Sequence, residues 1–240
     1  MTPASGLFRL SELDRTNFSD FRERIEAIEA EGVCDEPRRY PGYPCWRLPR
    51  VRMGRPIALE RALAHRRSVR VLGTATPSRR VLSRLLLAAH GITGPHHRGP
   101  VPSSGGLQGL ELYLVVFESG WLDAGLYHYD RLGHRLSQVG ARADRTAWQA
   151  RVPSMHQFSG GALLWVLVGD AARIERKYGP RAYRFLLLEA GQLMQNLCLL
   201  SEGLGLATLP LGGFFEHEVA EQLVLPPTDV VLYLGACGTP

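Results

Sequence analysis

The feature that most constrains this chain is a long apolar segment close to its C-terminal end. Residues 182–202, AYRFLLLEAGQLMQNLCLLSE, are apolar on nearly all sides when they are placed on a helix. A helix of this kind has no polar face to present to water, so it must be buried. The sequence therefore predicts a buried central helix with the other elements packed around it.

Both helices and strands are expected around this central helix. Apolar spacing and turn residues predict helices at residues 57–67 and 78–91, and a glycine- and proline-rich loop at residues 93–106. Because helices and strands mix without strict βαβ alternation, we expect an α+β fold with a central, mostly antiparallel sheet flanked by helices. The expected strands are residues 110–117, 126–129, 162–168, 206–209 and 230–236.

The first 50 residues differ in composition from the rest of the chain. Residues 11–31 are acidic and weakly helical. Residues 34–56 are rich in proline and aromatic side chains, which predicts an extended arm that wraps around the body. We therefore expect an acidic helix and an arm in residues 1–50, and one folded domain in residues 51–240.

The net charge of +5 is unevenly distributed. Residues 1–36 hold nine acids and four arginines, whereas residues 37–100 hold fourteen arginines and a single acid, Glu60. Such a basic block favours a polyanion, a phosphorylated cofactor or an acidic partner segment as its ligand. Nucleic acid is not expected, because the arginines are not interleaved with exposed aromatic residues and no nucleic-acid-binding motif is present.

Other classes of protein are not expected either. The N-terminus lacks the basic start and apolar stretch of a signal peptide, and no run approaches the roughly 18 apolar residues of a membrane span. The four cysteines show no spacing typical of a metal site. The expectation is a cytoplasmic protein without membrane attachment and without a bound metal.

Three segments carry candidate chemistry. Residues 66–70 (RRSVR) place three guanidinium groups and a hydroxyl together, which suits a phosphate or the polar edge of a flavin ring. The alternative is a solvated basic helix end. Residues 102–106 (PSSGG) and 209–214 (LPLGGF) are turns of small residues that let backbone approach a planar ligand closely, or else ordinary loops. None of the three is a dinucleotide fingerprint or a P-loop.

Lys177 is the only lysine among 28 basic residues, and all the others are arginines. Arginine stays charged at any accessible pH, whereas a desolvated lysine can lose its proton and act as a base. Lys177 precedes Tyr178 and Gly179, directly before the long apolar helix. Rarity alone is weak evidence, because a solvated charge at a helix start would look the same.

Taken in order, these segments resemble the FMN-dependent nitroreductase family. The similarity covers about residues 45–240, in which RRSVR is followed by LLLAAHGITG, PSSGG, GLYHYD, KYGPRAYR, LLLEAGQLMQNL and LYLGACGTP. Within this family the chain is most similar to the azoline dehydrogenases, which oxidise thiazoline and oxazoline rings in ribosomally made peptides. The YHYD segment and the EAGQLMQN helix point to this branch, from which the chain departs at residues 107–109 and at Gln192.

The resemblance implies one noncovalent FMN per active site in an intertwined homodimer, with the sites at the subunit interface. It also implies that Lys177 and Tyr178 form the catalytic pair. The residues implied to bind or line FMN are Arg66, Arg67, Ser68, Arg70, Pro102, Ser103, Ser104, Gly105, Gln195, Leu211, Gly212 and Gly213.

The implied activity is two-electron oxidation of an azoline ring to an azole. Tyr178 or neutral Lys177 would take the ring Cα proton while a hydride leaves for the flavin, and dioxygen would reoxidise the flavin. A cyclodehydratase and a peptide substrate are the implied partners. Two alternatives remain open: an NAD(P)H-dependent nitro- or quinone reductase, and a non-catalytic peptide-binding partner in a biosynthetic complex.

Overall fold

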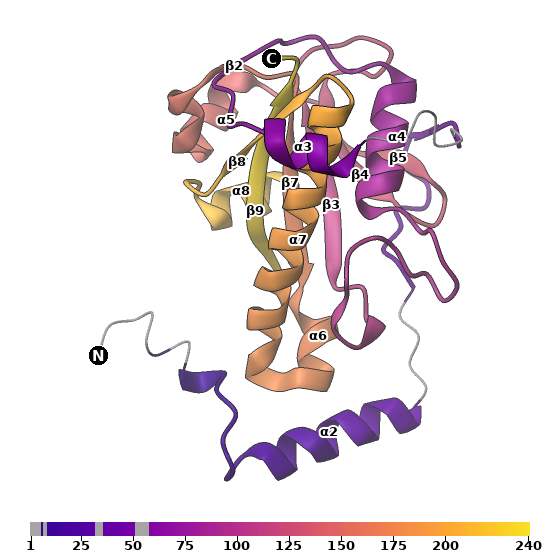
Figure 1. The fold of residues 1–240 in the computed structure, drawn as a ribbon, viewed down its shortest axis with the longest axis vertical. Coiled ribbons are helices and arrows are strands. Elements are labelled where there is room, and N and C mark those ends of the chain that lie inside the picture. The colour runs from indigo at the N-terminus through magenta and orange to yellow at the C-terminus, as the bar shows by residue number, and fades with distance from the viewer. Residues whose placement is uncertain (1–5, 7–8, 32–35, 51–57) are drawn as a thin grey trace.

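The computed structural model of the protein describes residues 6, 9–31, 36–50 and 58–240. In this part of the chain a seven-stranded sheet has the order β1-β5-β4-β3-β7-β9-β8 (Figure 1). All neighbouring strands in it are antiparallel, which confirms the predicted α+β fold. The strands of this sheet are β1 (Cys45–Arg47), β3 (Leu110–Val116), β4 (Gly125–Asp130), β5 (Arg135–Gly140), β7 (Leu163–Asp170), β8 (Ala207–Leu211) and β9 (Asp229–Gly238).

Two further short strands, β2 (Val71–Leu72) and β6 (Ser159–Gly160), form a separate parallel pair. Short 3₁₀ turns lie at Ser104–Gly106, Pro153–Gln157 and Gly179–Arg181. The helices are α2 (Phe18–Glu31), α3 (Leu59–His65), α4 (Arg79–His90), α5 (Arg145–Arg151), α6 (Ala171–Tyr178), α7 (Ala182–Gly203) and α8 (Glu216–Gln222).

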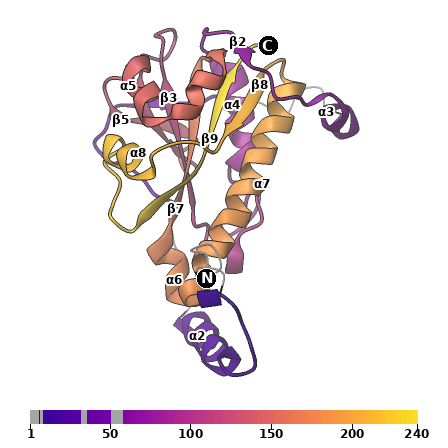
Figure 2. The same ribbon diagram turned by 90° about the vertical axis from the view of Figure 1, so that its left-hand side faces the viewer.

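Helices cover both faces of the sheet. Figure 2 shows α4 and α7 on one side of the strands and α5 and α8 on the other. Successive side chains of a strand point to opposite faces. Leu112 and Leu114 of β3 therefore pack toward α4 and α7, while Tyr113 and Val115 pack toward α5 and α8.

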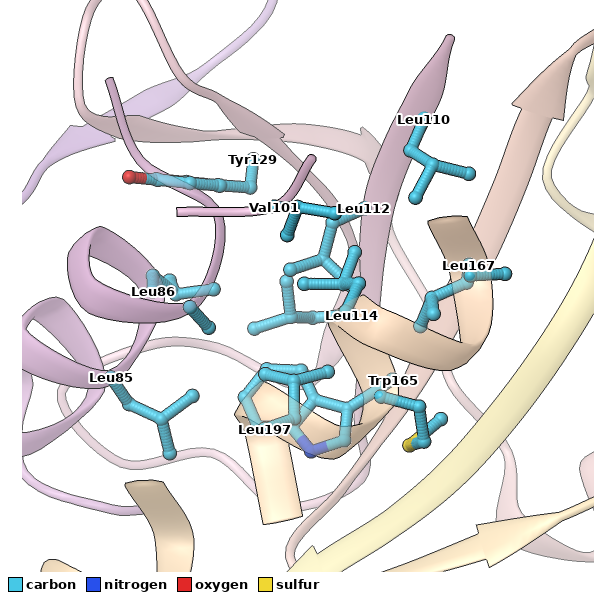
Figure 3. Packing of buried hydrophobic residues seen from close by; sticks show 14 of the residues in the cluster. Leu85, Leu86, Val101, Leu110, Leu112, Leu114, Tyr129, Trp165, Leu167 and Leu197 are labelled. Atoms are coloured by element: carbon cyan, nitrogen blue, oxygen red, sulfur yellow. The ribbon is translucent and has the colours of Figure 1, made fainter. Parts of the chain in front are cut away.

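The core between the sheet and α7 consists mainly of leucines around one tryptophan. Leu85 of α4, Leu114 of β3, Trp165 of β7 and Leu197 of α7 are fully buried and lie close together (Figure 3). The indole nitrogen of Trp165 donates to the hydroxyl of Thr208 at 3.2 Å. The largest core side chain therefore keeps its single polar group satisfied.

Helix α4 begins and ends where the sequence predicts. The side chain of Ser78 caps its N-terminus by accepting a hydrogen bond from the backbone of Val81 at 3.4 Å. Gly91 ends it, and a Cβ at this position would lie 2.5 Å from the carbonyl oxygen of Leu87. The boundaries follow from a side-chain cap at one end and from lack of room for a side chain at the other.

The predicted central helix is α7, which runs along the sheet. One of its faces is buried and includes Leu186, Leu193 and Leu197. On the opposite face Leu187 is 45% exposed and Leu188 is 58% exposed. The sequence places apolar residues all round this helix, but a single chain covers only the side that faces the sheet and α4.

Several elements of the structure were not predicted from the sequence. The strand β5 contains few apolar residues, and β1, β2 and β6 are only two or three residues long. Helix α6 was missed because its sequence, AARIERKY, is short and highly charged, although the side chain of Asp170 caps its N-terminus. The helix predicted at residues 57–67 is confirmed as the shorter α3, while residue 57 lies outside the described residues.

The N-terminal arm is attached to the sheet by a partly buried arginine. Arg38 forms ion pairs with Asp229 and, at 3.5 Å, with Asp170. Its guanidinium also donates to the hydroxyl of Tyr113 at 3.2 Å, and that hydroxyl lies 2.6 Å from the hydroxyl of Tyr40. The expected domain boundary at residue 50 adjoins residues 51–57, which lie outside the described part of the chain.

Replacing Arg38 tests how strongly the arm is fastened. We expect Arg38→Met to lower the free energy of unfolding at neutral pH by about 3–5 kcal/mol, because it leaves the buried carboxylate of Asp229 without its partner. Arg39→Met is the matched control, since the Arg39 side chain is 47% exposed and should contribute less than about 1 kcal/mol. Urea unfolding of the two variants measures the difference, and equal losses would contradict the assignment.

Candidate functional site

Lys177 and Tyr178 lie at the C-terminal end of α6, on its buried face. Lys177 is 5% exposed and Tyr178 is 9% exposed, while their neighbours Glu175 and Arg176 face solvent. Ile174 lies on the same side as this pair, at the three- and four-residue spacing of one helix face. Lys177 is therefore not a solvated charge at a helix start.

The buried ammonium group of Lys177 has one carboxylate partner among the described residues, Glu29 of α2. Its Nζ atom lies 2.8 Å from Oε1 of Glu29, whose side chain is 62% exposed. The ring of Phe21, also on α2, lies 6.1 Å from the ring of Tyr178. The acidic N-terminal helix thus covers the Lys177–Tyr178 pair.

The phenol of Tyr178 lies in a partly apolar setting between charges of opposite sign. The ring of Phe185 is 4.8 Å away, and Lys177 Nζ lies 5.7 Å from the centre of the Tyr178 ring. Burial raises the pKa of Tyr178, the Lys177 ammonium lowers it, and the carboxylates of Glu29 and Glu189 raise it. The protonation of this phenol therefore depends on the three charged residues around it.

The small-residue loop lies directly against this pair. Gly105 has a φ of +59°, and a Cβ there would lie 2.5 Å from the Tyr178 hydroxyl oxygen and 3.0 Å from Lys177 Nζ. Only glycine combines this backbone conformation with such a close approach. At the next position, Gly106, a Cβ would meet nothing within 4 Å. The structure thus brings Ser103, Ser104 and Gly105 together with the Lys177–Tyr178 pair.

A buried carboxylate that the sequence prediction missed holds this loop in place. Glu189 of α7 is buried, and its Oε1 accepts a hydrogen bond from the backbone N–H of Ser104 at 2.6 Å. Burial raises the pKa of Glu189, against the lowering effect of this hydrogen bond. The available signal was an acid in the middle of an apolar helix, which needs a partner when it is buried.

Behind the loop, Gln108 anchors the chain. Its backbone N–H donates to the hydroxyl of Ser103 at 2.8 Å, and its side-chain oxygen accepts from Arg131 at 2.7 Å. Arg173 of α6 donates to the Gln108 carbonyl at 2.9 Å. The loop and the helix that carries Lys177 are therefore joined by hydrogen bonds in the same chain.

The remaining candidate residues form a second group, around the C-terminal part of α7. Ser159 donates to the carbonyl of Arg70 at 2.9 Å, and Ser154 donates to the carbonyl of Gly213 at 3.1 Å through its backbone and 2.8 Å through its hydroxyl. Both candidate segments are thus attached to residues 154–159. The members of this second group are Arg66, Arg67, Ser68, Arg70, Gln195, Leu211, Gly212 and Gly213.

Most side chains of the second group point outward. Arg67, Ser68, Arg70 and Gln195 are exposed, and Arg66 is half-buried at the end of α3, which packs on α7. Among the described residues, neither Arg67 nor Arg70 has an acidic partner within 4.0 Å; the Arg67 guanidinium donates instead to the carbonyls of Ala64 and Arg66. These guanidinium groups form an open donor set that suits an anion.

The two groups lie at opposite ends of α7. Figure 1 shows α6 at the N-terminal end of this helix and α3 near its C-terminal end. From Ala182 to Gln195 the helix axis covers roughly 20 Å. One chain therefore brings Lys177 and Tyr178 to the loop that also contains the exposed Pro102, but does not bring them to the arginine segment.

The described residues contain neither a candidate metal site nor a candidate membrane-spanning helix. No group of three or more histidine, cysteine, aspartate or glutamate side chains among them is arranged to hold a metal ion. None of the helices in the described ranges is both long and apolar enough to cross a bilayer.

Comparison with known proteins identifies the class of protein. The nitroreductase family model matches residues 63–239, so the chain belongs to the nitroreductase family of oxidoreductases. It is 30% identical over 178 residues to the nitroreductase-like protein MJ1384 of Methanocaldococcus jannaschii, an alignment that covers 73% of this chain and 89% of that protein.

Two further relatives are named for the products that they process. The chain is 26% identical over 159 residues to the microcin B17-processing protein McbC of Escherichia coli, and 30% identical over 140 residues to the trifolitoxin-processing protein TfxB of Rhizobium leguminosarum bv. trifolii. These alignments cover 63% and 56% of this chain, but only 58% of McbC and 38% of TfxB.

Solved structures have the same fold. A nitroreductase-like protein from Anabaena variabilis matches with a TM-score of 0.72 at 25% identity, over 83% of this chain and 42% of that one. A chain of the Escherichia coli microcin synthetase McbBCD complex, with truncated pro-MccB17 bound, matches with a TM-score of 0.64 at 19% identity, over 95% and 98%. A nitroreductase-like protein from Exiguobacterium sibiricum in complex with FMN matches with a TM-score of 0.55 at 15% identity, over 76% and 87%. The last two matches show the fold alone.

The charged residues around Tyr178 predict that two substitutions shift its pKa in opposite directions. We expect Lys177→Met to raise the pKa of Tyr178 and Glu29→Gln to lower it, because the first removes a positive neighbour and the second a negative one. Glu26→Gln, one turn earlier on α2, is the control and should leave the Tyr178 pKa unchanged. Titration by carbon NMR of labelled tyrosines measures all three, with Tyr178→Phe to assign the signal. Shifts of the same sign in the first two variants would refute the arrangement.

Proposed function

We propose that this protein is an FMN-dependent azoline dehydrogenase, which oxidises thiazoline or oxazoline rings to azoles in a ribosomally made peptide. The observation that carries the proposal is the buried Lys177–Tyr178 pair, packed against the backbone of Gly105. Support also comes from similarity to McbC and TfxB, which are named for the processing of microcin B17 and of trifolitoxin.

The second group contains the types of side chain and backbone that bind the phosphate and the ring of FMN. Arg66, Arg67 and Arg70 supply guanidinium donors for the phosphate, and Ser68 adds a hydroxyl. A Cβ on Gly212 would meet nothing within 4 Å, so the backbone at Gly212 is open to a planar ring, with Leu211 and Gly213 on either side of it. The loop from Pro102 to Gly105 and the side chain of Gln195 would line the ring. Bound FMN would supply the two-electron redox chemistry.

The chain's own residues would then handle the proton. Lys177 is paired with Glu29 as an ammonium ion, so the proposed base is Tyr178 in its phenolate form, which would accept the ring Cα proton after its own proton has been released to solvent. The ammonium would stabilise the negative charge on the phenol oxygen. Glu189 would keep the Ser104 backbone in position, and with it the close approach of Gly105.

A homodimer would complete the site. Leu187 and Leu188 of α7, with Leu59 and Leu63 of α3, expose an apolar face in the single chain. Apolar surface of this kind marks a protein interface. We propose that pairing through this face brings the Pro102–Gly105 loop of one protomer to the arginine segment of its partner.

The other partners in the proposal are a cyclodehydratase, which makes the azoline ring, and the peptide itself. The structural match to one chain of the McbBCD complex supports assembly with biosynthetic partners. A cytoplasmic location agrees with this chemistry on a newly made peptide.

An NAD(P)H-dependent reductase is the second candidate, favoured by the similarity to MJ1384 over 73% of the chain. Stopped-flow mixing with NADPH separates the two activities. Rapid bleaching of the flavin absorbance would favour the reductase. Purified protein without flavin absorbance, which cannot take up added FMN, would favour a non-catalytic peptide-binding role.

The catalytic role of Lys177 can be tested directly. We expect Lys177→Ala to retain FMN and to lower the rate of azoline oxidation at least about 100-fold, because it removes the charge beside Tyr178. Arg176→Ala removes the adjacent exposed positive charge and should keep most of the activity. Single-turnover oxidation of an azoline peptide, followed by mass spectrometry, measures both. Full activity in Lys177→Ala would exclude the proposed role.

The proposed dimer interface can be tested separately. We expect Leu188→Glu to weaken dimerisation at least about 30-fold, because it puts a charge in the exposed apolar face. The FMN content should fall with it, since each site would need both protomers. Val224→Glu changes another exposed apolar residue that is not on α7, and serves as control. Sedimentation velocity measures the association, and an unchanged dimer in Leu188→Glu would place the interface elsewhere.

A further inference from the structure

A cavity lined by arginines lies beside the edge strand β1 and is distinct from both groups of candidate site residues. Its volume is about 430 Å³. None of its lining residues belongs to the Lys177 group or to the FMN group. It is lined by Arg39, Arg47, Leu48, Arg50, Leu132, Gly133, His134 and Arg135.

The charge of this arginine pocket is largely unbalanced. The buried carboxylate of Asp130 lies 2.7 Å from the guanidinium of Arg135 and 3.7 Å from that of Arg39. Among the described residues, neither Arg47 nor Arg50 has an acidic side chain within 4.0 Å. With only one carboxylate beside four guanidinium groups, the cavity carries a strongly positive net charge.

The floor of the pocket is uncharged and held in place. The Nδ1 atom of His134 lies 2.9 Å from the hydroxyl of Tyr129, and its Nε2 lies 2.9 Å from the hydroxyl of Ser83. Burial lowers the pKa of His134 against the raising effect of a hydrogen bond with the Pro49 backbone, and the nearby charge of Arg50 lowers it further. The positive charge of the pocket therefore comes from arginines alone, which remain charged at any physiological pH.

Size and spacing indicate what the pocket binds. A cavity of about 430 Å³ is of the size that holds an organic ligand or a stretch of peptide, and is far larger than a single phosphate needs. The guanidinium groups come from three separate segments, around residues 39, 47–50 and 135. Planar guanidinium groups bind carboxylates in a bidentate manner. Guanidinium groups on separate segments can therefore each bind one acidic side chain of an extended peptide. Buried Leu48 and the half-buried Leu132 add an apolar wall.

We propose that this pocket binds an acidic segment of the peptide substrate, separate from the ring that is oxidised. The inference rests on the proposed function for the identity of the peptide, but its geometry is independent of the flavin site. The pocket would hold the substrate at a second point and so raise its local concentration at Lys177 and Tyr178. It also gives a role to arginines of the basic block that the FMN site does not use.

Peptide binding to the full-length protein tests the inference. The probe is a fluorescent ten-residue peptide of alternating glutamate and glycine, followed by anisotropy. We expect the Arg47→Gln/Arg50→Gln variant to bind it at least about tenfold more weakly than the unmodified protein. Arg61→Gln/Arg142→Gln removes the same charge from exposed positions elsewhere and should change binding less than about twofold.

Three results would overturn the proposal. They are an equal loss in both double variants, equal binding of a peptide with glutamine in place of glutamate, and displacement of the peptide by inorganic phosphate at matched ionic strength. This assay uses neither flavin nor azoline, so a negative result would refute the peptide pocket without bearing on azoline oxidation. Likewise, full activity in Lys177→Ala would refute the proposed oxidation mechanism without bearing on peptide binding. In turnover of an acidic azoline peptide, Arg47→Gln/Arg50→Gln should raise KM and leave kcat unchanged.

Discussion

The packing of α7 against strands β3 and β7 is the contact on which the rest of the structure depends. Leucines of this helix pack against Leu114 and Trp165 in the main hydrophobic core. Its N-terminal half carries Glu189, which orients the Ser104–Gly105 loop against the Lys177–Tyr178 pair, and its C-terminal half supports α3 and the arginine segment. The helix thus sets the distance between the two groups of candidate site residues.

Buried charges explain how the N-terminal residues are attached. A charge taken out of water is costly unless it is paired. Glu29 pairs with Lys177, and Arg38 pairs with Asp229, so both N-terminal segments complete ion pairs that begin in the main body. Helix α2, which lies in the N-terminal part that composition alone separates from the domain, therefore contributes directly to the surroundings of Tyr178.

Much of the fold could be predicted because apolar spacing and caps are local signals. Ser78 and Gly91 mark the ends of α4, and continuous apolar runs mark β3, β7 and β9. Helix α6 could not be found this way, since a short, charged segment owes its stability to the partners of Ile174, Lys177 and Tyr178. Glu29 and Glu189 were missed for a related reason: their roles depend on contacts with residues far away in sequence.

The sequence by itself determined the class of fold, the nitroreductase resemblance and the candidate residues, because these follow from residue types in a given order. Only the tertiary structure decided which candidates meet. It placed Gly105 against Lys177 and Tyr178, Glu29 on the lysine, and the arginine segment at the far end of α7. It also gathered Arg39, Arg47, Arg50 and Arg135 around one cavity. The physical reason is that side-chain spacing along a chain is local, whereas burial and ion pairing depend on which segments the sheet and its helices bring together.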